Sequence, residues 1–456
     1  MKATDYRLTV GSLRELSTVG VVCGLASAYA GAVLTASDFL QRVGDETAGE
    51  LGALLGVVSG VFILIALFVS GLVISNGVDT VIAGRTRQLE LLRLIGAGAD
   101  QLRASLVRGV MKVAAIGSVI GLAVGVGAAD AARIVMVSRG TLPRMHYTVL
   151  PMTTVIAAAL VVGMAVLATL VGARSTLAGA SLGARRRSLR WLRVLAATAL
   201  VGFGVFLMIV ACVLGEFGVM GGFFAAFFGA AFTSTGLLIG ARIVVPSAVA
   251  AVGRLLGSGP AAVLARKNSV ADPARTTRST IGLFIGVTLV TTVVAGMSSL
   301  QKSIDSWEMP ADQVEDTRQM MQMTTWVLVG MIVISVVIAA VGFVSTMSLT
   351  VIGRTREIGV LRAMGFTAKQ VRGTITLESM ALSGTAMVGG LGLGVLFGAV
   401  GSQSLIGSMT SGFPIGLPLG AFVAIVAGTV VLVLVSALPP SRRAVSVSPV
   451  DALAIA

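Results

Sequence analysis

Residues 353–365 of this 456-residue chain read GRTREIGVLRAMG, and residues 84–96 read GRTRQLELLRLIG. Both stretches lie between two long apolar runs, and they start 269 residues apart. When this offset is kept without a gap, ten of the twenty positions from 84 to 103 are identical to their counterparts. The chain therefore contains an internal repeat, and we expect the two copies to have equivalent structures.

Glycines extend the repeat into the apolar run that follows each copy. Gly121 and Gly125 match Gly390 and Gly394 at the same offset. Each run also carries a third glycine four positions away, so that the two sets are Gly117, Gly121 and Gly125, and Gly390, Gly394 and Gly398. Glycines at this spacing form one stripe along a helix, where a second helix can approach closely. The matched sets predict two equivalent helix-packing surfaces.

The composition identifies the solvent in which the chain folds. Hydrophobic residues make up 55% of the chain and charged residues 12%, about half of the charged share that is usual in soluble domains. A membrane-spanning helix needs about 20 apolar residues. Such runs lie near residues 17–37, 52–76, 109–129, 152–173, 194–214, 221–245, 279–300, 325–350, 379–401 and 419–438. The sequence thus predicts about ten transmembrane helices and a multi-pass protein of the cell membrane, in contact with lipid.

The basic residues predict the orientation of these helices. With both termini in the cytoplasm, the inner segments hold 28 of the 34 Lys and Arg residues, whereas 11 of the 20 acids lie outside. The exception is the outer loop after the third span, which is expected to carry Arg133, Arg139 and Arg144. Because the net charge of +14 is spread over short clusters between apolar runs, nucleic-acid binding is not expected.

These observations predict an all-α polytopic membrane protein built from two four-helix repeats of the same orientation. Residues 1–173 would form the first half, 246–456 the second, and 174–245 a linker of two helices. The halves would be related by an axis along the membrane normal. Residues 1–30 also resemble a cleavable signal peptide, but we expect an uncleaved first span because the repeat needs it.

The stretch after residue 353 predicts a helix–turn–helix elbow at the inner surface of the membrane. Glu357 and Leu361 would share a face of a short helix of two to three turns, and Gly365 would end it. Thr367 and Gln370 would form a capping box that starts the next helix. Anchoring of the helix ends to lipid headgroups would explain the arginines, but it would not explain why Leu, Arg and Gly recur at fixed spacing in both copies. A docking surface for a partner protein explains both observations.

The elbow resembles the cytoplasmic coupling region of the FtsX-like (MacB-type) ABC transporter permease family, whose pattern is Arg-Glu-Ile-x-x-Leu-Arg-Ala-x-Gly. Residues 356–365 match this pattern closely, and residues 87–96 match it with Gln88 in place of the acid. Residues 264–277 resemble the amphipathic lead-in helix of the family, and residues 449–453 resemble its C-terminal Pro-x-x-Ala-Leu. The resemblance covers the second half and the first half through the elbow.

The resemblance implies that the chain docks on a separate cytoplasmic ABC ATPase dimer. ATP and Mg²⁺ would be bound by that partner, and this chain would bind no cofactor and catalyse no reaction. No Lys follows a Gly in the sequence, so a Walker A motif is absent. The implied ATPase-coupling residues are Arg354, Arg356, Glu357, Leu361, Arg362 and Gly365 in the second half, and Arg85, Arg87, Leu92, Arg93 and Gly96 in the first.

Three alternative functions differ in the sequence features that they require. A mechanotransmitting protein would pass ATPase motion to an extracytoplasmic partner through the acidic outer loop with Asp312, Glu315 and Asp316. An ion-coupled secondary transporter is disfavoured because each acid, Glu378 included, is expected in a loop or at the end of a span. An intramembrane enzyme is disfavoured because no catalytic pair or metal-ligand cluster lies at membrane depth. The outer loops are short, so the expected substrate partitions into the bilayer: a lipid, lipopeptide or hydrophobic peptide.

Overall fold

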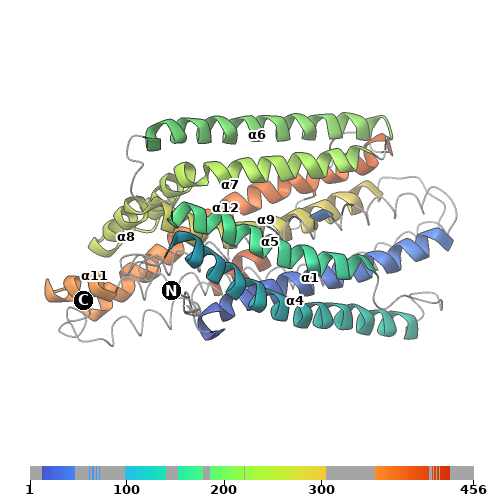
Figure 1. Cartoon of the computed structure of the whole chain (residues 1–456). Helices are drawn as coiled ribbons and strands as arrows, with labels where there is room; N and C mark the ends of the chain where they lie inside the picture. Colours follow the sequence, from blue (N-terminus) through green and yellow to red (C-terminus); the bar gives the residue numbers. More distant parts are fainter. Residues whose placement is uncertain are drawn as a thin grey trace, which may run out of the picture. The chain divides into compact units, whose positions relative to one another are not determined.

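The described part of the chain is helical throughout (Figure 1). The computed structural model describes residues 13–46, 61, 64–65, 68, 71, 98–139, 152–177, 185–219, 221–304, 355–409, 413, 415–416, 419–420 and 422–431. Among them, seven helices are long and apolar enough to cross a membrane: α1 (Leu13–Glu46), α4 (Ala99–Ser138), α5 (Met152–Leu177), α6 (Arg185–Glu216), α7 (Gly222–Leu255), α9 (Pro273–Ile304) and α12 (Ala368–Ile406). Three shorter helices are α8 (Pro260–Ala271), α11 (Thr355–Ala363) and the 3₁₀ helix η1 (Gly407–Met409).

Seven of the ten predicted spans coincide with these helices. The predicted spans 52–76 and 325–350 lie outside the described residues apart from single positions, and a short apolar helix, Phe422–Val431, falls within the predicted span 419–438. The helices are longer than the apolar runs that revealed them. At 1.5 Å per residue the 40 residues of α4 measure about 60 Å, twice the hydrocarbon thickness of a bilayer.

The chain divides into two compact units, Met1–Arg186 and Arg187–Ala456. In the first unit, α1 packs along α4, and α5 contacts both. The core between the three helices is formed by small and β-branched side chains, among them Val19, Cys23, Ala26, Val110, Ala114, Val161 and Ala165. Cys23 is buried there as a free thiol, as its place in an apolar run predicts.

The predicted glycine stripe of α4 lies against α1. A β-carbon on Gly117, Gly121 or Gly125 would overlap a backbone carbonyl oxygen of α1, namely that of Gly20, Gly24 and Ala28 respectively. Both helices therefore present small residues at four-residue spacing, which allows the two backbones to approach. The Ser27 and Ser118 hydroxyls are hydrogen bonded across this contact at 2.6 Å.

The far end of α4 corrects one expectation. Arg133 was expected in an outer loop, but α4 continues to Ser138 and Arg133 lies within it. Its guanidinium is ion paired with Asp130 at 2.6 Å and lies 5.8 Å from the ring centre of Phe39 in α1. Within the helix, this positive charge is stabilised by an acid one turn earlier and by an aromatic face of the neighbouring helix.

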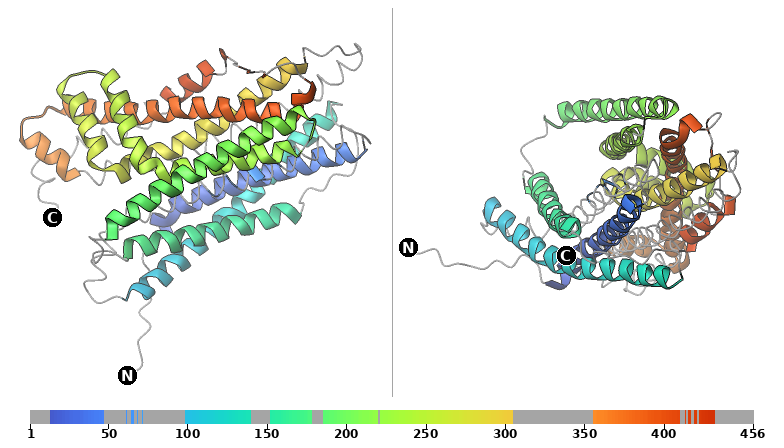
Figure 2. Two further views of the ribbon diagram at one scale, coloured as in Figure 1. Left: turned by 90° about the horizontal axis from the view of Figure 1, so that it is seen from above. Right: turned by 90° about the vertical axis from the view of Figure 1, so that its right-hand side faces the viewer.

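In the second unit, α12 packs against α9, α7 and α8 (Figure 2). The core near the beginning of α12 is formed by Val249, Leu283, Val287, Ala381, Leu382 and Ala386. The second glycine stripe faces α9. A β-carbon on Gly390 would lie 2.8 Å from Val287 Cγ1, and one on Gly398 would lie 2.6 Å from the Thr292 carbonyl oxygen.

The two helices of the predicted linker pack within this second unit. A β-carbon on Gly215 of α6 would overlap the carbonyl oxygen of Gln403 in α12. One on Gly222 of α7 would lie 3.2 Å from the Ser404 carbonyl oxygen. The two helices therefore meet the end of α12 at backbone contact distance, and the predicted boundary at 245/246 falls inside α7.

Candidate functional site

The elbow begins with α11, whose nine residues make about two and a half turns. The helix ends at Gly365, which adopts the left-handed φ of +95°. The amide of Phe366 donates to the Leu361 carbonyl at 3.0 Å, and that of Gly365 donates to the Arg362 carbonyl at 3.1 Å. This pair of bonds is the Schellman motif, and it confirms the helix stop predicted at Gly365.

The next helix starts after only two further residues. Thr367 Oγ1 accepts from the Gln370 amide at 3.3 Å, and the Gln370 side chain accepts from the Thr367 amide at 2.9 Å. The predicted capping box is therefore present, and it satisfies two backbone groups that would otherwise lack partners. Because both helix ends are capped, the elbow between α11 and α12 has a defined geometry.

One face of α11 is exposed. Glu357 is exposed, and so are the apolar side chains of Val360 (41%) and Met364 (66%). Positions 357 and 360 lie on one side of α11, and Met364 follows four residues later in the turn that ends the helix. Leu361 and Arg362, two of the predicted coupling residues, are half-buried instead. Val360 and Met364 were not among the residues predicted from the sequence. They lie four residues apart just before the predicted helix stop at Gly365, and this spacing could have identified them.

Helix α8 supports the beginning of α12. Ala262, Ala265 and Ser269 are buried at spacings of three and four residues, which places them on one face of α8. On the opposing helix, a β-carbon on Gly373 would lie 3.9 Å from Ala261 Cβ. In Figure 2, α8 and α11 lie at the same end of the helices of this unit, where α12 begins.

The junction of α8 and α9 is built by local hydrogen bonds. Asp272 separates the two helices, and its Oδ1 accepts from the Arg275 amide at 3.1 Å. Pro273 follows it as the first residue of α9, a position where its missing N–H has no helical acceptor to lose. Thr276 Oγ1 donates to the Ser269 carbonyl at 2.7 Å and so joins α9 to the end of α8.

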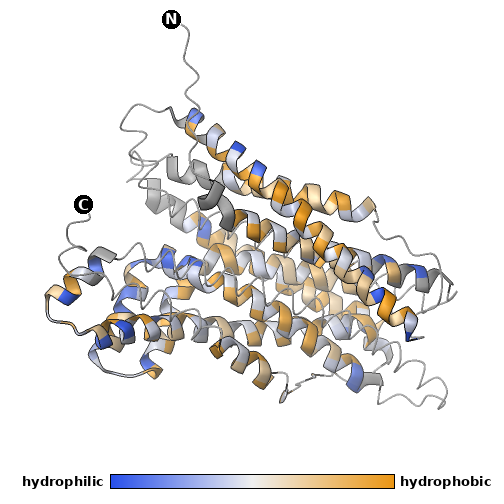
Figure 3. Cartoon of the chain, turned by 90° about the horizontal axis from the view of Figure 1, so that it is seen from below, coloured by the Kyte–Doolittle hydropathy of each residue, from blue (hydrophilic) through white to orange (hydrophobic). Residues whose placement is uncertain are grey.

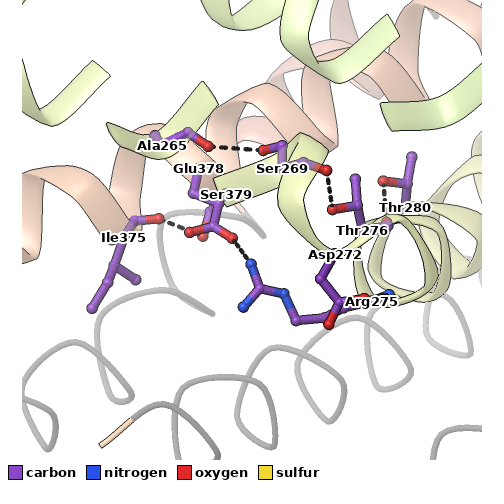
Figure 4. Close-up of polar contacts among 9 residues, drawn as sticks. All are labelled: Ala265, Ser269, Asp272, Arg275, Thr276, Thr280, Ile375, Glu378 and Ser379. Atoms are coloured by element: carbon purple, nitrogen blue, oxygen red, sulfur yellow. Dashed lines mark hydrogen bonds and ion pairs between the residues drawn. The ribbon is translucent and has the colours of Figure 1, made fainter. Parts of the chain in front are cut away.

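A buried ion pair joins this junction to α12 (Figure 4). Arg275 Nη2 lies 2.7 Å from Glu378 Oε1, and the two side chains are 16% and 7% exposed. Glu378 was expected at the end of a span, next to the apolar run 379–401. It lies in the third turn of α12, because that helix begins at Ala368, eleven residues before the predicted span. The partner arginine makes its burial tolerable.

The other predicted coupling residues are less fully described. Arg85, Arg87, Leu92, Arg93, Gly96 and Arg354 lie outside the described residues, as do Asp312, Glu315 and Asp316 of the predicted outer loop. Arg356 lies in α11, but its side chain is not described.

Charge separates the two ends of this unit. Exposed basic side chains lie at the end that carries the elbow: Arg254, Lys267, Lys369 and Arg372. Among the described basic residues of the unit, Lys302 lies at the other end, where its Nζ donates to the Ile415 carbonyl at 3.2 Å. Figure 3 shows hydrophilic residues gathered toward the helix ends and hydrophobic ones along the middle.

Comparisons with known proteins agree with this architecture. The sequence model of the FtsX-like permease C-terminal domain matches residues 60–178 and again residues 329–449, more than half of the chain. The macrolide export ATP-binding/permease protein MacB of Nitrobacter winogradskyi is 37% identical over 121 residues, which are 26% of this chain and 18% of that protein. MacB 1 of Yersinia pseudotuberculosis is 33% identical over 143 residues, 31% of this chain and 20% of that protein.

The chain thus aligns with about a fifth of the length of these relatives. The matched segments contain the elbow, both glycine stripes and three of the long apolar helices, α4, α5 and α12. On these grounds, the chain belongs to the FtsX-like (MacB-type) permease family and is a multi-pass protein of the cell membrane.

Proposed function

We propose that this chain is the membrane subunit of an ABC transporter and that a separate ATPase dimer drives it through the elbow. The observation that carries the proposal is the exposed face of α11, formed by Glu357, Val360 and Met364. An exposed apolar pair beside a carboxylate on a short, capped helix suits a protein partner, because apolar side chains anchor such contacts while the charge orients them.

The charge distribution supports a cytoplasmic elbow. Exposed basic residues lie at the elbow end of the second unit, and cytoplasmic loops of membrane proteins carry an excess of Lys and Arg. A cytoplasmic position is the one in which an ATPase could reach α11. The names of the relatives, which pair ATP binding with a permease, favour the same source of energy.

The double match to the family model supports the two-repeat architecture. Its two segments start at residues 60 and 329, which is the 269-residue offset of the sequence repeat. We propose ten spans in two like-facing halves, with a second elbow at residues 85–103 that meets the other ATPase subunit. ATP and Mg²⁺ would be bound by the ATPase, and this chain would catalyse no reaction itself.

The proposed substrate is a hydrophobic molecule that enters from the bilayer, such as a lipid, lipopeptide or hydrophobic peptide. The relatives are named for macrolide export, which is the export of an organic molecule. The long apolar helices expose large hydrophobic side chains such as Phe203, Phe206 and Leu396, which gives a membrane-dissolved molecule access to their surfaces.

Co-purification tests the proposal. The tagged chain should recover an ABC ATPase from its native membrane, and Val360→Asp/Met364→Asp should reduce that recovery about tenfold or more, because it places charges in the proposed contact. The matched control is Leu255→Asp, which alters an 86% exposed side chain at the end of α7. The proposal fails if the double variant recovers as much ATPase as the control. It also fails if the purified chain alone transports substrate on an ion gradient.

A further inference from the structure

The ion pair of Arg275 and Glu378 joins two arms of the second unit. One arm is the elbow, which continues without interruption into α12 and reaches Glu378 in its third turn. The other arm is α8 with the beginning of α9, which reaches Arg275 in its first turn. The two residues are 103 positions apart in the sequence, so the pair links segments that the chain itself does not hold together.

Further along the two helices, Leu283 and Val287 of α9 pack against Ala381, Leu382 and Ala386 of α12. Between α8 and α12 the residues are small: a β-carbon on Gly373 would lie 3.9 Å from Ala261 Cβ, and the buried residues of α8 include Ala262 and Ala265. Alanine and glycine surfaces permit close approach, but they have few interlocking atoms to resist sliding. A charge-assisted hydrogen bond of 2.7 Å between nearly buried groups is directional and short-ranged, so it fixes one register.

Both charged groups are also held from their own side. The Arg275 amide is bonded to Asp272 at the start of α9, and Thr276 ties the same turn to Ser269 of α8. Arg275 therefore moves with α8 rather than as a free side chain. Glu378 is carried by a helix that begins at a capping box, so it moves with the elbow.

We infer that Arg275 and Glu378 are a positioning pair that makes α8 and the first turns of α9 follow α12 when the elbow is displaced. This inference rests on the proposed function for the source of the displacement. Removal of Arg275 or Glu378 takes away the opposite charge that lies 2.7 Å from the remaining group, which weakens the link between the two arms. The pair would thus convert a push on one short helix into a movement of two spans.

A distance measurement on the chain alone tests whether the Arg275–Glu378 ion pair holds α8 and α12 in one position. Spin labels would be placed at the exposed positions Lys267 on α8 and Arg372 on α12, in a full-length chain with Cys23 and Cys212 replaced by alanine, in lipid nanodiscs. The wild-type pair should give one narrow distance distribution by electron paramagnetic resonance. Glu378→Gln and Arg275→Met should each broaden it. Glu216→Gln and Arg254→Met, which alter exposed charges on α6 and α7, should not.

Two double variants guard against simple misfolding. Arg275→Glu/Glu378→Arg restores an ion pair with reversed charges, and Arg275→Met/Glu378→Leu replaces it with an apolar contact of similar volume, which buried ion pairs often tolerate. At least one of them should return the narrow distribution. Single variants as narrow as wild type, or a broad distribution in both double variants, would overturn the inference.

The second part of the experiment uses the complex with the co-purified ATPase. In the wild type, the distance between the two labels should be the same without nucleotide and with trapped ATP, because the arms move together. In Glu378→Gln, trapped ATP should change that distance while the ATPase still co-purifies. A distance in Glu378→Gln that trapped ATP leaves unchanged would overturn the role in coupling. Absence of any ATPase from the wild-type preparation would overturn the proposed function and leave the result on the chain alone standing.

Discussion

The α1–α4 and α9–α12 contacts use glycines at the same four-residue spacing but meet different partners. In the first unit, the atoms that β-carbons on Gly117, Gly121 and Gly125 would overlap belong to the backbone of α1, at Gly20, Gly24 and Ala28. In the second unit, those closest to Gly390 and Gly394 are side-chain atoms of Val287 and Thr291. At Gly390 and Gly394 the second stripe thus meets β-branched side chains, whereas Gly398 meets the backbone of α9 at Thr292 and Gly296, as the first stripe meets the backbone of α1.

The difference shows that a glycine pattern fixes where helices meet but not how closely. Where both helices present glycine or alanine at the contact, the two backbones touch each other, and no side-chain rotation can relieve a clash. Where one helix keeps Val and Thr, a side chain fills the groove, and another side chain or rotamer can relieve a clash. The two contacts should therefore respond differently to the same substitution.

The largest effect is expected for Gly121→Ala. Its methyl group would overlap the carbonyl oxygen of Gly24, and no side-chain movement removes a backbone atom. We expect a destabilisation of about 3 kcal/mol, at the upper end of the range for overpacked cores. Thermal unfolding of the chain in detergent would measure it. A melting temperature equal to that of wild type would show that α1 and α4 are farther apart than described.

A smaller effect is expected for Gly394→Ala in the second unit. The added methyl group would overlap Thr291 Cβ and lie 2.8 Å from the Thr288 carbonyl oxygen. We expect a loss of about 1–2 kcal/mol. Thr291→Gly in the same chain should recover part of it, because the nearest obstacle is a side chain. A double-mutant cycle by thermal unfolding measures that recovery. Strictly additive effects would contradict the assignment of Thr291 as the obstacle.

A third difference concerns hydrogen bonds across the contacts. Ser27 and Ser118 are hydrogen bonded between α1 and α4, and Ser118 also donates to the Ala158 carbonyl of α5 at 3.3 Å. Thr288 of α9 donates instead to the Phe284 carbonyl of its own helix. Ser27→Ala should therefore cost about 0.5–1.5 kcal/mol, and Thr288→Ala should show no coupling to substitutions in α12. Coupling of Thr288 to Gly390→Ala in a double-mutant cycle would remove this distinction.

The smallest effects are expected at glycines that face away from the contacts. A β-carbon on Gly127 of α4 or Gly392 of α12 would have nothing within 4 Å. Replacement by alanine should be neutral or stabilise by up to about 1 kcal/mol, because alanine favours the helix. These variants serve as matched controls for Gly121 and Gly394 in the same unfolding assay. A large loss at Gly127 or Gly392 would show that these faces contact another chain or segment.

Much of the architecture could be predicted from the sequence. Apolar runs located the seven described long helices, because the bilayer requires a nearly uninterrupted apolar segment. Gly365, Thr367 and Gln370 predicted the turn of the elbow, because helix caps are local and depend on residues within a few positions.

What only the tertiary structure decided depends on contacts between distant residues. The apolar-run criterion ended one span before Arg133 and began another after Glu378, yet both residues lie inside helices, where they are ion paired with Asp130 and Arg275. No local sequence pattern predicts that Glu378 pairs with Arg275, which lies 103 residues away in the sequence. The exposure of Val360 and Met364 and the residues opposite each glycine stripe were also known only from the packed structure. Burial depends on both surfaces that pack together, so neither sequence segment alone determines it.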